Sequence, residues 1–314
     1  MTSPKFEAGS TLLEDTGERY IPGVGGQIFH CHAHRYRLAC GLAADLDVLD
    51  LPSGEGYGSS WIAATAAQVV GVDIAEHVVK HAKRTYASQP NLAFVAGDMQ
   101  DLPIADAAAD LVVSFEGIEH VSDPWLAMSE IARVLRPDGA LLISTPDRRS
   151  YSDKLGFVNE FHLSEMYAKE FEDLLRRHFR FFDLLGQQPF GGSLLWPLPD
   201  PADFDALDHY SADSTVHRLR PPDDAQYLVA FCRNVDRGVP LEFQRPSLFI
   251  GEPHESPGAS PEPVATELGG PNDRAHDEVE ELREEVALLS QRLTLIEGSR
   301  TWRLRSRAVR LLRS

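Results

Sequence analysis

The sequence has few cysteines, no long apolar stretch and a shortage of basic residues, and each shortage excludes a class of protein. Its 314 residues include three cysteines, Cys31, Cys40 and Cys232, which form no CxxC pair. Three cysteines cannot all pair with one another, which fits a reducing compartment, so we expect a cytoplasmic protein. No uncharged apolar run approaches about 18 residues, and no basic segment followed by an apolar stretch begins the chain. We therefore expect neither a membrane span nor a signal peptide.

Basic residues are outnumbered: 30 Lys and Arg stand against 48 Asp and Glu, a formal net charge of −18. Affinity for nucleic acid comes mainly from Lys and Arg that neutralise phosphates, so we expect no nucleic-acid partner. Residues 300–314 differ, because they hold six arginines, Trp302 and several leucines but no acid. A basic amphipathic segment is typical of peripheral contact with the inner face of a membrane or with a protein partner, although a solubilising tail has a similar composition.

Short apolar runs typical of strands alternate with helical patterns between residues 46 and 146. The expected order is strand 46–51, helix 59–67, strand 68–74, helix 75–87, strands 91–98 and 109–116, helix 123–135 and strand 139–146. This alternation predicts an α/β domain whose mostly parallel sheet is covered by helices on both faces. A further helix at 164–178 precedes two apolar runs, 179–187 and 226–234, which we expect to pair as antiparallel edge strands.

The C-terminal part changes in composition. Residues 246–271 contain six prolines and four glycines, which predicts a linker. Beyond it, apolar residues follow one another at spacings of 3, 4, 3, 4 and 3: Val279, Leu282, Val286, Leu289, Leu293 and Ile296. These two and a half heptads indicate either a solvated amphipathic helix or a short coiled coil that joins copies into a homo-oligomer.

A glycine-rich turn and two aspartates mark the expected carboxyl edge of the sheet. Gly54, Gly56 and Gly58 lie between the first strand and its helix, where glycine allows a ligand to approach the backbone closely. Their GxGxG spacing differs from the GxGxxG of dinucleotide-binding proteins. Asp73 and Asp98 follow the next two strands, and Asp73 lies 19 residues after Gly54, where a ribose-binding acid is expected. Each acid alone could equally cap a helix, but together they favour a nucleotide-containing ligand.

Five segments carry a resemblance to a known family. They are VLDLPSGEGYG (48–58), VVGVDI (69–74), FVAGDMQDLP (94–103), DLVVSFEGIEHVSDP (110–124) and EIARVLRPDGALLISTP (130–146). In this order they resemble the class I S-adenosylmethionine-dependent methyltransferases, specifically the methyltransferase type 11 group. The resemblance implies a Rossmann-like, doubly wound, seven-stranded, mostly parallel sheet with a reversed last strand. It also implies that S-adenosyl-L-methionine binds across the carboxyl edge of that sheet.

The same resemblance assigns the cofactor-binding residues. The loop 54–58 is expected to wrap the amino-acid end of the cofactor, Asp73 to bind the ribose hydroxyls, and Asp98 with Met99 to face the adenine. The full expected set is Asp50, Ser53, Gly54, Gly56, Gly58, Asp73, Ile74, Asp98, Met99 and Glu116. The sequence departs from the family at Pro52, where a small residue is usual; proline fixes φ and removes a backbone donor, which leaves the loop geometry open.

Two residues after the fourth strand are candidates for catalysis. Methyl transfer from a sulfonium is an in-line displacement that depends on alignment, and a hydroxyl acceptor must also lose its proton. Glu119 and His120 arrive at the cofactor's edge, and His120 is the candidate general base because imidazole titrates near working pH. The alternative is that His120 only shapes its loop. His162 either faces the acceptor or enters the helix at 164–178, with Ser164 as its N-cap.

An N-terminal cluster, HCHAHRYR (30–37), offers four potential metal ligands: His30, Cys31, His32 and His34. Only His30 and His34 share a helix face, so the sequence predicts no metal site. Together with GERYIPG (17–23) and SGEGYGS, the cluster resembles bacterial methyltransferases encoded with surface-polysaccharide genes. That resemblance implies an N-terminal lid over the cofactor, with contributions from Arg19, Tyr20, His34 and Tyr36.

These patterns predict a methyltransferase that O-methylates a sugar of a surface glycan or glycan precursor, so the acceptor is a small molecule or a glycan. The expected domains are a lid segment (1–44), a methyltransferase domain (45–243), a linker (244–274) and a helical or coiled-coil tail with an arginine-rich end (275–314). Three alternatives stay open: methylation of a metabolite such as a quinone or polyketide, a nicotinamide-dependent oxidoreductase, and a non-catalytic scaffold that gathers proteins of glycan assembly through its tail.

Overall fold

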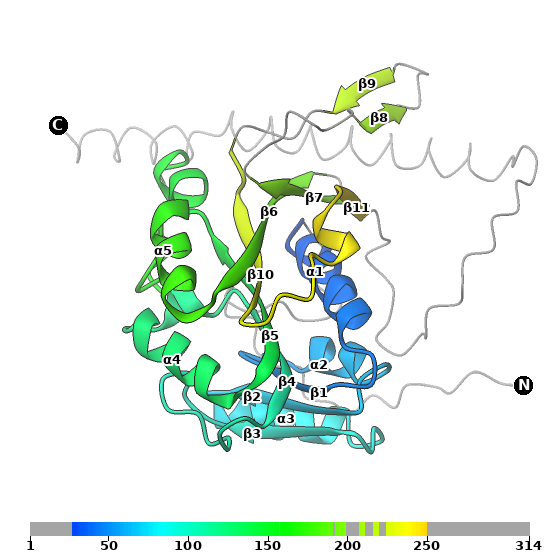
Figure 1. The fold of residues 1–314 in the computed structure, drawn as a ribbon, viewed down its shortest axis with the longest axis vertical. Coiled ribbons are helices and arrows are strands. Elements are labelled where there is room, and N and C mark those ends of the chain that lie inside the picture. The colour runs from blue at the N-terminus through cyan, green and yellow to red at the C-terminus, as the bar shows by residue number, and fades with distance from the viewer. Residues whose placement is uncertain are drawn as a thin grey trace, which may run out of the picture. The chain divides into compact units, whose positions relative to one another are not determined.

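A nine-stranded sheet forms the centre of the protein (Figure 1). The computed structural model describes residues 27–156, 158–190, 192–198, 207–210, 216–219 and 224–249. The strands of the sheet follow the order β11-β7-β6-β10-β5-β4-β1-β2-β3. Their bounds are β1 (Asp47–Asp50), β2 (Gln68–Asp73), β3 (Leu92–Ala96), β4 (Ala109–Phe115), β5 (Leu135–Pro146), β6 (Phe181–Phe190), β7 (Gly192–Leu198), β10 (Tyr227–Arg233) and β11 (Ser247–Phe249).

Strand direction divides this sheet into two halves. The parallel half consists of β1 to β5, which pair in parallel with one another. The antiparallel half consists of β10, β6, β7 and β11, each antiparallel to its neighbours, with β10 also antiparallel to β5. Seven strands thus run in one direction, while β7 and β10 run in the other. The mostly parallel α/β sheet with a reversed strand is confirmed, with β10 as that strand.

The predicted number of strands and the predicted edge position of the two late strands are wrong. The sheet has nine strands where seven were expected, because β7 and β11 extend it beyond β6. Strand β11 also lies inside residues 244–274, which were assigned to the linker. The two late apolar runs do pair as antiparallel strands, but β10 lies between β5 and β6 and neither of the two is an edge strand. Burial explains this position, since every residue of β10 is buried, as suits a central strand.

Helices cover both faces of the sheet (Figure 1). They are α1 (Gln27–Leu42), α2 (Tyr57–Ile62), α3 (Glu76–Thr85), α4 (Pro124–Val134) and α5 (Ala168–His178). Three short helical segments, Ile118–His120, Arg149–Asp153 and Leu241–Phe243, and a separate antiparallel pair, β8 (Leu207–Tyr210) with β9 (Val216–Leu219), complete the described elements. None of the described helices has the length and apolar character needed to cross a membrane.

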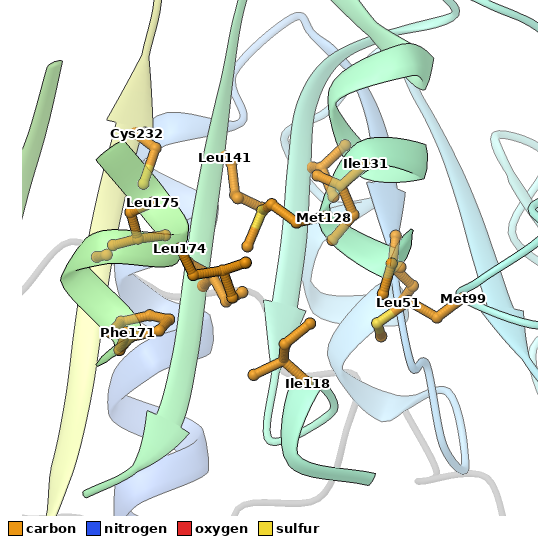
Figure 2. Close-up of a cluster of buried hydrophobic side chains, with 14 of the residues drawn as sticks. Leu51, Met99, Ile118, Met128, Ile131, Leu141, Phe171, Leu174, Leu175 and Cys232 are labelled. Carbon is orange, nitrogen blue, oxygen red and sulfur yellow. The ribbon is translucent and has the colours of Figure 1, made fainter. Parts of the chain in front are cut away.

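Each face of the sheet has its own apolar core. On the face of α4 and α5, side chains such as Met128, Leu141 and Leu174 pack together with Leu51 and Met99, which come from the loops of the parallel half (Figure 2). On the other face, Tyr36 and Val79 pack with residues of the strands. Because the sheet is buried on both sides, its strands are fixed in place, and so are the loops at their carboxyl ends.

The first residues of helices α4 and α5 lie close in the sequence to residues of the predicted site. Asp123 caps α4, its Oδ1 accepting hydrogen bonds from the backbone N–H groups of Trp125 (3.0 Å) and Leu126 (3.1 Å). Helix α5 begins at Ala168, so Ser164 is not its N-cap, and the interpretation of His162 as a helix-entry residue is wrong. The rest of the predicted lid before residue 27, the coiled coil and the arginine-rich end all lie outside the described residues and stay predictions.

Candidate active site

A cavity of about 480 Å³ lies at the carboxyl ends of the strands of the parallel half. Loops after β1, β2, β3 and β4 supply most of its lining, as expected for an open α/β sheet. Five carboxylates line it: Glu55, Asp73, Asp98, Glu116 and Glu160. No lysine or arginine is among the described lining residues. The cavity therefore favours a cationic ligand over a phosphate-bearing one.

Asp73 holds the loop beside it and faces the cavity. The side chain is 3% exposed, and its Oδ2 accepts a hydrogen bond from the backbone N–H of Gly54 at 3.0 Å. Its Oδ1 accepts one from the backbone N–H of Ala75 at 2.9 Å. A carboxylate offers about four lone-pair sites, so one side chain can hold a loop and also accept hydrogen bonds from hydroxyl groups of a ligand. Gly54 itself has φ of 53°, and a Cβ there would meet no atom within 4 Å, which leaves open space for a ligand against the backbone.

The other predicted cofactor-binding residues in the lining follow β1, β2, β3 and β4. Asp98 stabilises the turn that follows β3, because its Oδ1 accepts a hydrogen bond from the backbone N–H of Gln100 at 2.8 Å. Met99 is buried, whereas Ile74 is 68% exposed and offers an apolar surface directly after Asp73. Seven of the predicted residues thus line the cavity: Ser53, Gly54, Asp73, Ile74, Asp98, Met99 and Glu116. An apolar surface next to acidic groups fits a flat base attached to a ribose.

Three predicted cofactor-binding residues lie outside the described lining. Asp50 is fully buried and accepts hydrogen bonds from Ser59 Oγ (2.6 Å) and Tyr36 Oη (3.3 Å), and burial raises its pKa to about 7. A Cβ at Gly58 would come within 2.0 Å of the Tyr36 ring, and one at Gly56 within 2.8 Å of Phe94. These two glycines are required for packing beneath the loop, so the structure gives no support to their assignment as ligand contacts.

Glu116 is anchored from the N-terminal helix. Arg35 of α1, which is 1% exposed, donates hydrogen bonds to Glu116 Oε1 and to Ser144 Oγ, and Ser144 Oγ in turn donates to Glu116 at 2.7 Å. The charge of Glu116 and its hydrogen bond raise the pKa of Arg35 despite the opposing effect of burial. Glu116 is therefore a cavity residue whose position depends on α1.

Glu119 and His120, the predicted catalytic pair, lie in the short helical segment that follows β4. His120 lines the cavity, but Glu119 lies behind the lining and is fully buried. Burial and the charge of Glu116 raise the pKa of Glu119. His162 packs edge-on against His120, with ring centroids 4.9 Å apart, although it is not in the described lining. Exposed apolar side chains, Phe161 and Leu163, line the cavity on either side of His162 in the sequence.

Two histidines of the N-terminal cluster face different parts of the structure. His34 has its ring nitrogens 3.1 Å from Ser193 Oγ and 2.9 Å from Ser247 Oγ, so it faces β7 and β11 and not the cavity. His32 lies 3.0 Å from Tyr57 Oη, and both line the cavity. Of the predicted lid residues, Tyr36 also lines the cavity, His34 does not, and Arg19 and Tyr20 lie outside the described residues.

Several lining residues were not among the predicted binding residues: Glu55, Tyr57, Gln100, Phe115, Gly117 and Glu160. Glu55 and Tyr57 lie within the glycine-rich loop itself, so their positions in the sequence were an available signal. Glu55 is further fixed by Tyr86 Oη, which donates to it at 2.7 Å, and by His81 at 3.0 Å. Glu160 has no comparable signal, because only the tertiary fold brings residues 160–163 to this edge.

Residues 49–143 match a family model described as a methyltransferase domain. A protein of Mycolicibacterium smegmatis named "Probable S-adenosylmethionine-dependent methyltransferase" is 39% identical over 168 residues, 52% of this chain and 64% of that protein. A protein of Mycobacterium tuberculosis with the same description is 37% identical over 171 residues, 54% of this chain and 61% of that protein. A demethylmenaquinone methyltransferase of Beutenbergia cavernae is 37% identical over 122 residues, 38% of this chain and 50% of that protein.

Among solved structures, the YcgJ protein from Bacillus subtilis aligns with a TM-score of 0.49 and 18% identity, over 65% of this chain and 99% of that one. The chain spans less than two thirds of the length of the curated relatives named above. Residues 49–143 thus match a methyltransferase domain, and the first two relatives named above are described as probable S-adenosylmethionine-dependent methyltransferases.

Proposed function

We propose that this protein transfers a methyl group from S-adenosylmethionine to an acceptor bound in the same cavity. The observation that carries the proposal is the charge of the lining, five carboxylates with no lysine or arginine among the described residues. A sulfonium cofactor is cationic at its reacting centre, whereas the pyrophosphate of a nicotinamide cofactor is anionic. The methyltransferase domain match and the names of the relatives support the same choice.

The residues present fit this cofactor. Asp73, which lines the cavity at the end of β2, would bind the ribose hydroxyls. Open space at Gly54 would admit the amino-acid end of the cofactor, and Asp98 with Met99 would face the adenine. When bound, the cofactor supplies the electrophilic methyl group. The chain's own contribution is to orient that group and the acceptor in line and to keep water out.

The first prediction concerns Asp73. Asp73→Asn keeps the size of the side chain but replaces one acceptor oxygen with a donor, so we expect affinity for S-adenosylmethionine to fall about tenfold or more. Isothermal titration calorimetry measures this change, and titration of the wild type with NAD gives the comparison between cofactors. Asp106→Asn, at an exposed carboxylate outside the described lining, is the matched control and should bind as the wild type does. Unchanged affinity in Asp73→Asn would refute the site assignment.

We propose an oxygen of the acceptor as the methylated atom. The Glu119, His120 and His162 side chains lie together, and His120 lines the cavity, so a hydroxyl group bound beside His120 could be activated. The acceptor oxygen bonds to the methyl carbon as the carbon–sulfur bond breaks, and the electron pair stays on sulfur. A sugar hydroxyl of a surface glycan or glycan precursor is the acceptor that the sequence resemblance suggests.

A second acceptor class, an apolar ring such as a quinone, is favoured by one observation. Phe161 and Leu163 line the cavity and are 45% and 65% exposed. Relatives named demethylmenaquinone methyltransferase point to the same class. Incubation with methyl-labelled S-adenosylmethionine and separate pools of nucleotide sugars, lipid-linked sugars, polymeric glycan and quinones decides between them. Label in the quinone pool alone would exclude the sugar acceptor.

A further inference from the structure

Three side chains that can bind metal ions meet beside the cavity. Glu119, His120 and His162 each offer one ligand atom, and these atoms lie within 4.8 Å of one another. Two donors bound to one zinc ion about 2.0 Å away lie about 3.3 Å apart, so small side-chain rotations are enough to bring them together. His120 lines the cavity, which puts this cluster in reach of a bound acceptor.

The two imidazole rings are oriented as in metal sites. Nδ1 of His120 lies 3.1 Å from the carbonyl oxygen of Phe161, and Nδ1 of His162 lies 2.5 Å from Oε1 of Glu165. Carbonyl and carboxylate oxygens accept hydrogen bonds, so each Nδ1 is the donor in these contacts and Nε2 is the ring nitrogen that would ligate a metal ion. Metal-binding histidines are held in this way, with the other ring nitrogen donating to a carbonyl or a carboxylate.

Glu119 supplies an independent observation. The residue is fully buried, and its Oε2 accepts a hydrogen bond from Thr145 Oγ1 at 3.3 Å. Its Oε1 is buried too, and no described group donates a hydrogen bond to it. Buried carboxylates are normally paired, hydrogen-bonded or bound to a metal ion. A cation within the cluster would satisfy this oxygen.

Hydrogen bonds join the two segments that form the cluster. Ser164 donates from its backbone N–H to the carbonyl oxygen of Glu119 (2.9 Å) and from its Oγ to the carbonyl oxygen of Val121 (2.6 Å). Tyr151 stacks on His162, with ring centroids 5.5 Å apart and planes inclined by 26°. The cluster is therefore held in place before any ligand binds, which lowers the entropic cost of binding.

We propose that Glu119, His120 and His162 bind a divalent transition-metal ion. Two imidazoles and one carboxylate are a ligand set that suits zinc and neighbouring metals, and three protein ligands leave coordination positions open. This placement replaces the sequence-based expectation that the protein has no metal site. The site's role rests on the proposed function: the open positions take oxygen atoms of the acceptor.

A metal ion there would activate the acceptor without a separate base. A hydroxyl group bound to the ion has a lowered pKa and releases its proton to solvent. The oxygen then attacks the methyl carbon, and the electron pair of the broken carbon–sulfur bond stays on sulfur, which leaves S-adenosylhomocysteine. His120 is in this case a ligand and not the proton acceptor.

Metal titration of the full chain, after treatment with a chelator and without cofactor or acceptor, tests the proposal. We expect calorimetry to show one Zn²⁺ bound per chain, and Co²⁺ to give the visible absorption of a nitrogen- and oxygen-ligated ion. Glu119→Gln and His162→Ala should each weaken Zn²⁺ binding at least tenfold. Glu165→Gln, which changes only the partner of His162, should weaken it about 10- to 100-fold.

His77→Ala, at an exposed histidine of α3, is the matched control and should bind Zn²⁺ as the wild type does. Circular dichroism and S-adenosylmethionine affinity report whether each variant folds. Absence of Zn²⁺ and Co²⁺ binding in the wild type would overturn the proposal, as would binding that survives both Glu119→Gln and His162→Ala. Metal binding without S-adenosylmethionine binding would instead refute the proposed function and leave the metal site standing.

Discussion

The two halves of the sheet differ in what they give to the cavity. All five strands of the parallel half end at the same edge, and the loops after four of them, β1 to β4, supply most of the described lining. In the antiparallel half β6 and β7 form a hairpin, and β6, β7, β10 and β11 supply no described lining residue. One half thus carries the candidate chemistry, and the other must contribute in a different way.

The contribution of the antiparallel half is to position helix α1. His34 of α1 meets Ser193 of β7 and Ser247 of β11, and Gln187 of β6 donates to the carbonyl oxygen of Cys31 at 3.1 Å. The same helix reaches the parallel half through Arg35, which binds Glu116. The comparison teaches that strands without a lining residue can still determine the shape of a site through a shared helix.

Removing the Arg35–Glu116 ion pair, which joins α1 to the parallel half, should have the largest effect on stability. Arg35→Met leaves Glu116 and Ser144 without their buried cationic partner, so we expect the free energy of unfolding to fall by about 3 to 5 kcal/mol. Urea denaturation followed by circular dichroism measures this loss. Lys80→Met, in an exposed pair with Glu76, is the control and should leave stability essentially unchanged. Equal stability of Arg35→Met and the wild type would show that the Arg35–Glu116 ion pair does not stabilise the fold.

The stability that His34 contributes by joining α1 to the antiparallel half should depend on pH. Burial, aided by the charge of Arg35, lowers the pKa of His34 to about 4 from its ordinary 6.5. The folded state therefore binds fewer protons than the unfolded state between these values. The stabilising contribution is complete above pH 6.5 and is lost as the pH falls toward 4, by at most about 1.4 kcal/mol per pH unit.

Urea denaturation at pH 7 and pH 5 of the wild type and His34→Gln measures this effect. We expect the wild type to lose more stability on acidification than the variant, while His77→Gln at an exposed position follows the wild type. Parallel pH profiles for wild type and His34→Gln would mean that His34 does not titrate on unfolding.

Another prediction separates packing from ligand contact within the parallel half. A Cβ at Gly58 would overlap the Tyr36 ring, so Gly58→Ala should lower the free energy of unfolding by about 1 to 3 kcal/mol. Gly41→Ala, in α1 with no atom within 4 Å of the added Cβ, is the matched control and should raise it by about 0.5 kcal/mol. Unchanged stability of Gly58→Ala with weakened cofactor binding would restore Gly58 as a ligand contact.

The strands of the parallel half were predicted from the sequence more completely than those of the antiparallel half. In the parallel half, apolar runs bounded by turn residues predicted all five strands, and Asp73 and Asp98 were placed at strand ends correctly. In the antiparallel half, β7 was not predicted, because Pro197 lies within it and proline argues against a strand. Strand β11 has only three residues, too few for a period to be read.

The sequence by itself determined the α/β class, the glycine-rich turn and the acids that follow β2 and β3, because these depend on residues close together in the chain. Tertiary structure decided which of them reach the cavity: it buried Asp50 under Tyr36 and placed Gly58 against the same ring. It also brought Arg35 to Glu116, 81 residues away, and His162 to His120. Such contacts form only when the sheet closes around its core, since no local pattern of hydrophobicity or turn chemistry specifies a partner that far along the chain.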